Sequence, residues 1–299
     1  MVKKSILVTG ASGFVGSRLA PRLVEAGYEV RAMTRHPDSY RGAGTAFAGD
    51  VSEPNSLEQA LEGVDAAYYL VHSLDTTNFS ARDDAGAANF AKAAAGADLE
   101  RIIYLGGLGV DDGHMSAHLR SRRHVEQVLR SESVPVTVLR AAVIVGHGGI
   151  SWEITRQLVE HLPLLLTPRW VNTRTQPIAI EDVIRYLVGV LDPIEARGMT
   201  YEIGGPDVLR YIDMLERAAA IERKPLPNIT VPLLTPRLSS AWLALVTDVD
   251  FTTARNLVDS MTTEVVVHDH SIEQIVPGAT ISYEDAVRAA LDERAHARD

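Results

Sequence analysis

The segment of residues 6–16, with the sequence ILVTGASGFVG, constrains the fold more than any other part of the chain. It begins with three apolar residues, as does a parallel strand that is covered on both faces. Gly10 and Gly13 remove side chains where a backbone turns tightly and approaches a diphosphate, and Gly16 lets the next helix lie close to the strand. The N-terminus of that helix offers N–H groups and a positive dipole end to phosphates. Glycines also mark ordinary turns, but the strand before and the helix after predict dinucleotide binding.

The rest of the first half alternates short apolar runs with helical patterns. The expected strands are residues 5–9, 29–33, 45–48, 66–71, 101–105 and 136–142. A first helix is expected over residues 13–26, and an alanine-rich helix over residues 85–95, with Asp83 and Asp84 before its N-terminus. This alternation predicts the α/β class, a doubly wound parallel sheet (Rossmann fold), with a small C-terminal substrate lobe. The ligand crevice is then expected at the carboxyl ends of the strands.

The pattern loosens after residue 142, where Pro163, Pro168 and Pro177 interrupt it. A strand at residues 178–180, a helix at 181–191, a strand at 201–203 and a C-terminal helix at 283–293 are expected. We therefore assign residues 1–146 and 177–205 to a dinucleotide-binding Rossmann domain. Residues 147–176 and 206–299 are assigned to the smaller substrate-binding lobe.

Composition narrows the class of protein. With 299 residues, 46% of them hydrophobic, the chain can bury a substantial core. A net charge of −10 argues against a nucleic-acid binder, and the absence of cysteine excludes disulfides and thiolate chemistry. The N-terminal residues lead directly into the first strand, and the apolar stretches are far shorter than the roughly 20 residues of a membrane span. We expect a cytoplasmic protein with no signal peptide and no membrane span.

The end of the second strand indicates which cofactor is bound. NAD-binding versions of this fold place an acidic residue there for the ribose 2′-OH, whereas this chain reads Met33-Thr34-Arg35-His36-Pro37. Arg35 is suited to pair with a 2′-phosphate and to stack on the adenine. The alternative is a solvated arginine on a loop. The sequence favours NADP(H) over NAD(H).

The spacing T-G-x-x-G-x-x-G at residues 9–16, Asp50-Val51, the strand end YLGGLG at residues 104–109 and PIAIEDV at residues 177–183 are together typical of one family. On these motifs, over residues 5–205, the chain resembles the extended and atypical short-chain dehydrogenase/reductases. Within them it is most similar to the NmrA-like, NAD(P)H-binding group, often labelled sugar-nucleotide epimerase-like. The resemblance implies that Asp50 and Val51 meet the adenine amino edge, although Asp50 could also cap the following helix. The cofactor contacts that motifs and resemblance imply are Thr9, Gly10, Ser12, Gly13, Phe14, Val15, Gly16, Thr34, Arg35, Asp50, Val51, Val71, His72, Gly106 and Gly107.

The catalytic residues of this family are a serine and a tyrosine four residues before a lysine, and this chain lacks them. His118 falls in the place of the tyrosine, Arg122 in that of the lysine, and the serine place near Gly106 and Gly107 carries glycine. In one interpretation His118 donates the proton, because imidazole titrates near neutral pH, while Arg122 holds the nicotinamide ribose and favours neutral His118. In the other, His118 is an ordinary residue at a helix start in a protein that binds cofactor without turnover. Arg122 would then belong to a solvated helix face with Arg120 and Arg123.

Other residues are weaker candidates. His72 could orient substrate, and the glycines of residues 146–149 (GHGG) suggest close backbone approach to a ligand, although a plain turn explains them equally. Pro168, Arg169, Trp170 and Arg174 could meet an anionic substrate or lie on the lobe's surface. His268 and His270 lie on one face of an extended segment with Asp269 opposite, so no metal site is expected. The apolar patch of Trp242, Leu243, Leu245 and Val246 is expected in the core, in the wall of the substrate pocket or in a dimer face.

These observations favour an NADP(H)-binding oxidoreductase that transfers hydride to a small carbonyl, enone-like or quinone-like substrate. The principal alternative is a non-catalytic NADP(H) sensor that acts through a protein partner. Sugar-nucleotide epimerase or dehydratase chemistry is disfavoured, because the acid–base groups that it requires are not found. The expected partner is a small-molecule substrate, and a homodimer through the fourth and fifth helices would suit the fold.

Overall fold

A seven-stranded parallel sheet forms the centre of the molecule in a computed structural model, which describes residues 3–72, 79–109, 115–162, 164–167, 169–230, 247–248 and 251–297. The strand order is β11-β6-β5-β4-β1-β2-β3, and every pairing in this sheet is parallel. The strands are β1 (Ser5–Thr9), β2 (Glu29–Thr34), β3 (Thr45–Ala48), β4 (Ala66–Tyr69), β5 (Arg101–Gly107), β6 (Val136–Ala141) and β11 (Thr200–Ile203). This order is that of a doubly wound Rossmann sheet and confirms the predicted fold class.

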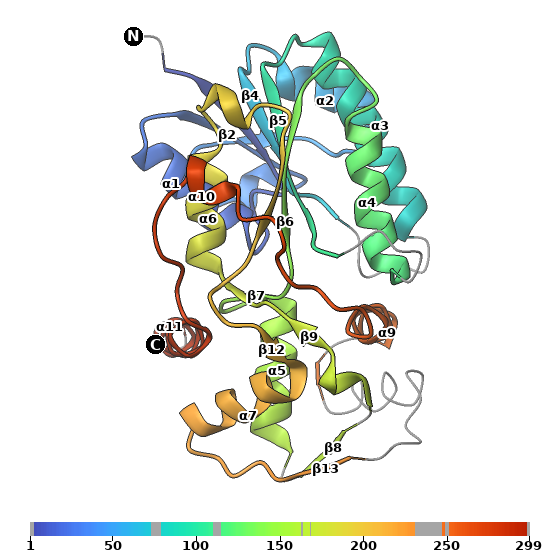
Figure 1. The fold of residues 1–299 in the computed structure, drawn as a ribbon. Coiled ribbons are helices and arrows are strands. Elements are labelled where there is room, and N and C mark those ends of the chain that lie inside the picture. Colours follow the sequence, from blue (N-terminus) through green and yellow to red (C-terminus); the bar gives the residue numbers. More distant parts are fainter. Residues whose placement is uncertain are drawn as a thin grey trace.

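Helices cover both faces of the sheet (Figure 1). On one face lie α1 (Gly16–Glu25), α6 (Ile180–Gly189) and α10 (Ile272–Ile275); on the other lie α2 (Pro54–Leu61), α3 (Phe79–Gly96) and α4 (Ala117–Leu129). Strand β1 shows why its sequence is apolar throughout. Ile6 and Val8 belong to the hydrophobic cluster on one side, and Leu7 belongs to the cluster on the other.

The strand order reverses between β1 and β4, which is where a doubly wound sheet opens a crevice for ligand. Thr9 joins these two strands at their carboxyl ends. Its hydroxyl donates to the carbonyl oxygen of Tyr68 at 3.0 Å and accepts from the amide of Leu70 at 2.9 Å. The sequence predicts Thr9 as a cofactor contact, but Thr9 is completely buried and its side chain does not line the cleft. Its hydroxyl holds the two strands together.

The remaining elements form a lobe below the carboxyl ends of the strands (Figure 1). Its helices are α5 (Ile150–His161), α7 (Tyr211–Ile221), α9 (Phe251–Ser260) and α11 (Tyr283–His296). Strand pairs join β7 (Ile144–Val145) to β10 (Ile178–Ala179), β9 (Arg174–Thr175) to β12 (Leu209–Arg210), and β8 (Leu165–Thr167) to β13 (Asn228–Thr230). A 3₁₀ turn at Arg169–Asn172 belongs to the lobe, whereas the 3₁₀ turns at Pro37–Ser39 and Ile194–Ala196 follow β2 and α6 beside the main sheet. The lobe has its own hydrophobic cluster, built around Trp152, Tyr211 and Tyr283. Within the described ranges no helix combines the length and apolar character needed to cross a membrane.

The observed boundaries depart from the expected ones in a few places. Helix α1 begins at Gly16 and not at residue 13, because a turn closed by Gly13 N–H on Gly10 O at 2.9 Å comes first. The short strand expected at residues 178–180 pairs with β7 outside the main sheet. Helix α3 already begins at Phe79, so Asp83 and Asp84 lie inside it instead of before its N-terminus.

The expected boundary of the lobe also changes. Ile272 and Val276, which the sequence placed in the lobe, belong to the hydrophobic cluster on the α1 and α6 side of the sheet. This part of the C-terminal segment therefore packs on the Rossmann domain before the chain returns to the lobe as α11.

Candidate functional site

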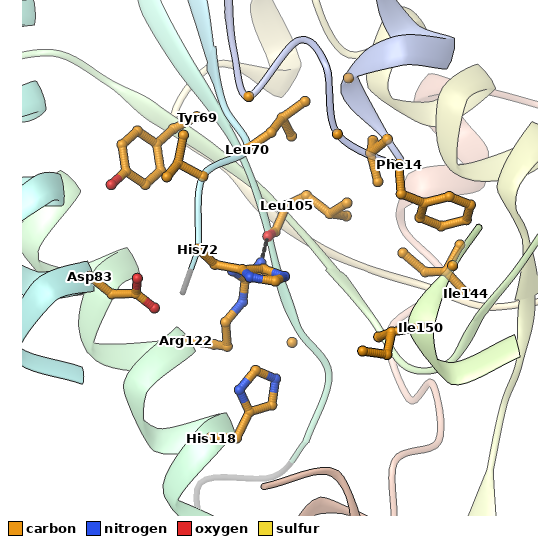
Figure 2. A pocket seen from close by; sticks show the side chains of 18 of the residues that line it. Phe14, Tyr69, Leu70, His72, Asp83, Leu105, His118, Arg122, Ile144 and Ile150 are labelled. Atoms are coloured by element: carbon orange, nitrogen blue, oxygen red, sulfur yellow. Dashed lines mark hydrogen bonds between the residues drawn. The ribbon is translucent and has the colours of Figure 1, made fainter. Parts of the chain in front are cut away.

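A cleft of about 960 Å³ lies at the carboxyl ends of the strands, and both the Rossmann domain and the lobe line it. It brings together residues that are far apart in the sequence (Figure 2). Of the expected site residues, those that line it are Gly10, Ser12, Gly13, Phe14, Val15, Gly16, Thr34, Arg35, Asp50, Val51, Val71, His72, Gly106, Gly107, His118 and Arg122. Thr9 is the exception.

The glycine turn at one wall is shaped to receive a diphosphate. Gly10 has a φ of +62°, a conformation that glycine adopts without strain. A Cβ at Gly16 would lie 2.3 Å from the carbonyl oxygen of Gly10, so helix α1 can approach the turn only because this side chain is missing. A Cβ at Gly13 would lie 3.2 Å from the same oxygen. These three positions provide the close backbone approach that a dinucleotide requires.

The expected adenosine end of the cleft continues into a second, smaller pocket. This pocket has a volume of about 260 Å³ and shares Ser12, Thr34 and His36 with the main cleft. Its other lining residues are Ala11, Ser17, Ser39, Tyr40, Arg41 and Gly42. Arg35, between Thr34 and His36 in the sequence, is exposed and lines the main cleft. Polar hydroxyls and cations thus surround the place expected for the ribose 2′-substituent.

Asp50 lines the cleft at the end of β3 and does not cap α2, whose N-cap residue is Glu53. One carboxylate oxygen of Asp50 accepts from both the amide and the hydroxyl of Ser52 at 2.8 Å. The Ser52 amide, together with the charges of Arg35 and Arg82, holds the pKa of Asp50 below its usual range against the effect of burial. Asp50 is therefore an anion that can accept a hydrogen bond at this wall.

His118 and Arg122 project from α4 toward the end of β5 (Figure 2). Arg122 donates to the carbonyl oxygen of Leu105, and its guanidinium lies 5.1 Å from the centroid of the Tyr104 ring. The Tyr104 hydroxyl in turn donates to the carbonyl oxygen of Arg122 at 3.1 Å. These contacts attach the cation to strand β5.

The pKa of His118 is lowered to about 3 by burial first, and then by the charges of Arg122 and His72. This corrects the expectation that His118 titrates near neutral pH. The imidazole is neutral at pH 7, so it is a hydrogen-bond donor or acceptor and not a cation.

The place of the family's serine is filled by neighbouring side chains. A Cβ at Gly107 would lie 2.8 Å from Cδ2 of Leu119, and a Cβ at Gly106 would lie 3.2 Å from Cε1 of Tyr104. Leu119 and Tyr104 thus occupy the space that a side chain would need. A serine side chain at either glycine would therefore require Leu119 or Tyr104 to move.

Contacts at both ends of α4 hold His118 and Arg122 in place. At the N-terminus, Ser116 accepts from the amide of Leu119 at 3.2 Å, and its hydroxyl lies 3.1 Å from that of Ser260 in α9. Further along, the buried carboxylate of Glu126 accepts from Arg140 of β6, with distances of 3.1 Å to Nε and 2.8 Å to Nη2. The helix is therefore tied to the sheet and to the lobe.

Sequence reasoning missed several residues that line the cleft. Two are Arg82 and Asp83 of α3, and from the lobe come Tyr211, Thr253, Ser260, Met261 and Val265. Asp83 is buried, and Figure 2 shows its carboxylate in the same part of the cleft as Arg122. Asp83, Ala87 and Phe90 lie on the same buried face of α3 because they are spaced three and four residues apart. A carboxylate on an otherwise apolar helix face is unusual, and this was the signal in the sequence that could have identified Asp83 as a site residue.

The structure places the remaining candidate residues of the lobe in different environments. Gly148 and Gly149 line the cleft, whereas Arg174 is exposed, does not line it, and forms a bidentate pair with Glu264 at 2.8 and 2.9 Å. Arg174 is therefore placed on the surface of the lobe. Pro168 and the patch of Trp242, Leu243, Leu245 and Val246 lie outside the described residues, and Arg169 and Trp170 lie in the 3₁₀ turn that follows β8.

The expected histidine pair lies away from the cleft. His270 Nδ1 is 3.2 Å from Glu273 Oε1, and Asp269 accepts from the amide of Ser271 at 2.8 Å. In the part of the chain that the structure describes, no group of three His, Cys, Asp or Glu side chains is arranged to hold a metal ion.

Comparison with known proteins agrees with this geometry. Residues 10–161 match the model of a family described as NAD(P)H-binding. An uncharacterised protein of Mycobacterium tuberculosis is 29% identical over 242 residues, which are 80% of this chain and 26% of that protein, so the chain spans about a quarter of its length. The (4-alkanoyl-5-oxo-2,5-dihydrofuran-3-yl)methyl phosphate reductase of Streptomyces griseus is 28% identical over 74% of this chain and 75% of its own. Sanguinarine reductase of Eschscholzia californica is 26% identical over 68% of this chain and 89% of its own.

Solved structures show the same fold at low sequence identity. The NADPH-dependent quinone oxidoreductase QOR2 of Escherichia coli, complexed with NADPH, aligns with a TM-score of 0.78 and 17% identity over 95% of this chain and 98% of that one. A nucleoside-diphosphate-sugar epimerase of Staphylococcus aureus aligns with a TM-score of 0.77 and 13% identity over 95% of this chain and 99% of that one. The fold is thus shared by reductases and by epimerases.

Proposed function

The chain belongs to the NAD(P)H-binding family, and from this premise we propose that it is an NADP(H)-dependent oxidoreductase that reduces a small carbonyl or quinone-like substrate. One observation carries the proposal. A single cleft joins the glycine turn for a diphosphate to a neutral imidazole, His118, at the end of β5, beneath a lobe that closes the other side. The reductases among the relatives support the class of reaction.

The preference for NADP(H) rests on the end of β2 and the pocket beside it. Arg35 would pair with a 2′-phosphate, and the hydroxyls of Ser12 and Ser39 and the cation of Arg41 line or border the same space. No acidic residue stands where the ribose 2′-OH of NAD(H) would need one.

The residues around His118 indicate how the reaction would be assisted. When bound, the cofactor supplies a hydride. His118 would donate a hydrogen bond from its ring N–H to the substrate oxygen as negative charge develops there, since a neutral imidazole can act as such a donor. The proton that converts this oxygen to a hydroxyl would come from solvent as the product leaves. Burial, and after it the charge of Arg122, keep the imidazole neutral, and Arg122 also adds positive charge nearby. The shape of the lobe wall, which includes Met261 and Val265, would exclude water from this end.

The second candidate function is a non-catalytic NADP(H) sensor. A specific observation favours it: the tyrosine, lysine and serine of the family are absent, and a His118 with a pKa of about 3 is a weak reservoir of protons at pH 7. The two candidates differ in turnover and not in cofactor affinity.

The first experiment is a titration of the protein with NADPH and NADH by nicotinamide fluorescence, followed by addition of a panel of carbonyls and quinones. We expect tighter binding of NADPH, and Arg35→Ala should weaken it about tenfold while leaving NADH almost unchanged. Arg22→Ala, at an exposed arginine of α1, is the control. If neither cofactor binds, the proposal fails at its premise.

The panel then separates enzyme from sensor. Oxidation of NADPH by any member establishes an enzyme, and His118→Ala should lower kcat about 100-fold with little change in cofactor affinity. His124→Ala, on the exposed side of the same helix, is the matched control. Tight binding without turnover on the whole panel, and indifference to His118→Ala, would favour the sensor.

A further inference from the structure

A ring of charged contacts links the C-terminal helix to the loop of residues 146–149 and to the glycine turn. We propose that α11, through Glu293 and Arg294, positions this loop and Phe14 at the wall of the cofactor cleft. Glu293 and Arg294 are then positioning residues for the cofactor, an inference whose functional consequence rests on the proposed NADP(H) binding.

The first half of the ring passes through Arg18, in the first turn of α1. Its Nη1 donates to the carbonyl oxygen of Phe14 at 2.9 Å, and its Nη2 donates to that of His147 at 2.8 Å. The same Nη2 lies 2.5 Å from Oε1 of Glu293. One guanidinium thus joins the glycine turn, the loop and α11.

The second half of the ring passes through α5. Oε1 of Glu153 accepts from the amide of Gly148 at 3.1 Å and lies 3.2 Å from Nδ1 of His147. Oε2 of Glu153 accepts from Nε of Arg156 at 2.8 Å. The Gly148 amide and Arg156 hold the pKa of Glu153 below its usual range, although burial opposes them.

Helix α5 leads the ring back to the C-terminal helix. Arg156 also pairs with Glu160, and Oε2 of Glu160 lies 3.3 Å from Nη2 of Arg294. Neighbouring residues of α11 therefore hold the loop from two directions, one through α1 and the other through α5.

The held loop is packed directly against the glycine turn. A Cβ at Gly149 would lie 2.7 Å from Cζ of the Phe14 ring, and one at Gly146 would lie 3.2 Å from the same atom. The guanidinium of Arg18 also lies over the Phe14 ring, 4.8 Å from its centroid. Phe14, Gly148 and Gly149 all line the cleft, so a movement of the loop changes its shape.

The charges of the ring are only partly buried. The side chains of Arg18 and Glu293 are 24% and 43% exposed, so each pair by itself contributes little and is weakened by salt. We expect the pairs to act together, because the loss of the Glu293 carboxylate separates Arg18 from α11. The loop of residues 146–149 then loses one of its two connections to that helix.

The test compares Glu293→Gln with Asp292→Asn, a matched change at the neighbouring exposed residue of α11. Glu293→Gln should raise the NADPH Kd about threefold to fivefold and speed hydrogen exchange of the amides in residues 146–149, with Tm almost unchanged. Arg18→Gln should raise both quantities at least as much, because it also removes the bonds to Phe14 and His147, and the double variant should be no worse than Arg18→Gln alone. Asp292→Asn should leave both quantities as in the wild type.

Unchanged exchange in Glu293→Gln, or additive effects of the two substitutions, overturns the positioning role. Exchange measured without cofactor gives this answer by itself. A wild-type chain that binds neither cofactor therefore refutes the proposed function separately, while the exchange rates still show whether α11 holds the loop.

Discussion

At the scale of single residues, environment decides the chemistry of His118. The same imidazole in water would be partly protonated near neutral pH, but burial and the nearby Arg122 lower its pKa to about 3. His118 is therefore a neutral group that can donate a hydrogen bond, and not the proton donor that the sequence predicts. The charge of Arg122 is held on Leu105 and Tyr104, so its effect on His118 is a fixed property of the site.

This shift predicts how stability depends on pH. Between pH 6.5 and about 3, the unfolded chain binds a proton at His118 that the folded chain does not, so the free energy of unfolding falls as pH falls. His118→Asn removes this proton, and its Tm should therefore drop less than that of the wild type between pH 7 and pH 5. Thermal unfolding without cofactor measures the difference. His124→Asn serves as the control, and parallel losses in the wild type and His118→Asn would contradict the assigned pKa.

At the scale of elements, the unit of β1, glycine turn and α1 is the most demanding part of the fold. The helix can start where it does because Gly16 brings its backbone against Gly10. The apolar face of α1, with Leu19 and Leu23, then packs into the sheet cluster. The same close approach of α1 to the turn therefore serves both the packing of the helix and the shape of the expected phosphate site.

Because Gly16 lies so close to the backbone of Gly10, we expect Gly16→Ala to destabilise the folded chain. Its Cβ would meet backbone atoms that cannot move independently, so the free energy of unfolding should fall by about 2 kcal/mol and NADPH binding should weaken. Gly96→Ala, at the end of α3 where a Cβ meets nothing within 4 Å, is the matched control and should be neutral or slightly stabilising. Chemical denaturation of both variants measures the difference. Equal stability of the two would mean that α1 can shift without cost.

At the scale of the whole molecule, the cleft lies between the carboxyl ends of the sheet and the lobe, because residues of both parts line it. The sheet supplies the cradle, and the lobe supplies the opposite wall through Tyr211, Thr253 and Met261. Helix α11 packs against α7 and against the short strands β7 and β10. It therefore joins a helix of the lobe to the strand pair that follows β6.

A ligand in this cleft should stabilise the folded chain as a whole. At 100 times its Kd, NADPH should add about 2.7 kcal/mol to the free energy of unfolding and raise Tm by about 5 °C. NADH at the same concentration should raise Tm less. A thermal shift series with both cofactors measures this, and equal shifts would contradict the assigned NADP(H) preference.

The sequence by itself determined the parts of this protein that depend on local rules. The strands of the sheet, the turn at Gly10 and the position of Arg35 and Asp50 at the strand ends that line the cleft follow from apolar runs, glycines and chain order, because neighbouring residues define them. Tertiary structure alone decided the rest. Thr9 is buried between two strands, Arg174 pairs on the surface, Asp83 enters the cleft, and His118 loses its proton, because contacts between distant segments determine burial and charge. The contact of Arg18 with Glu293 of α11 is of the same kind, since these residues are 275 positions apart in the sequence.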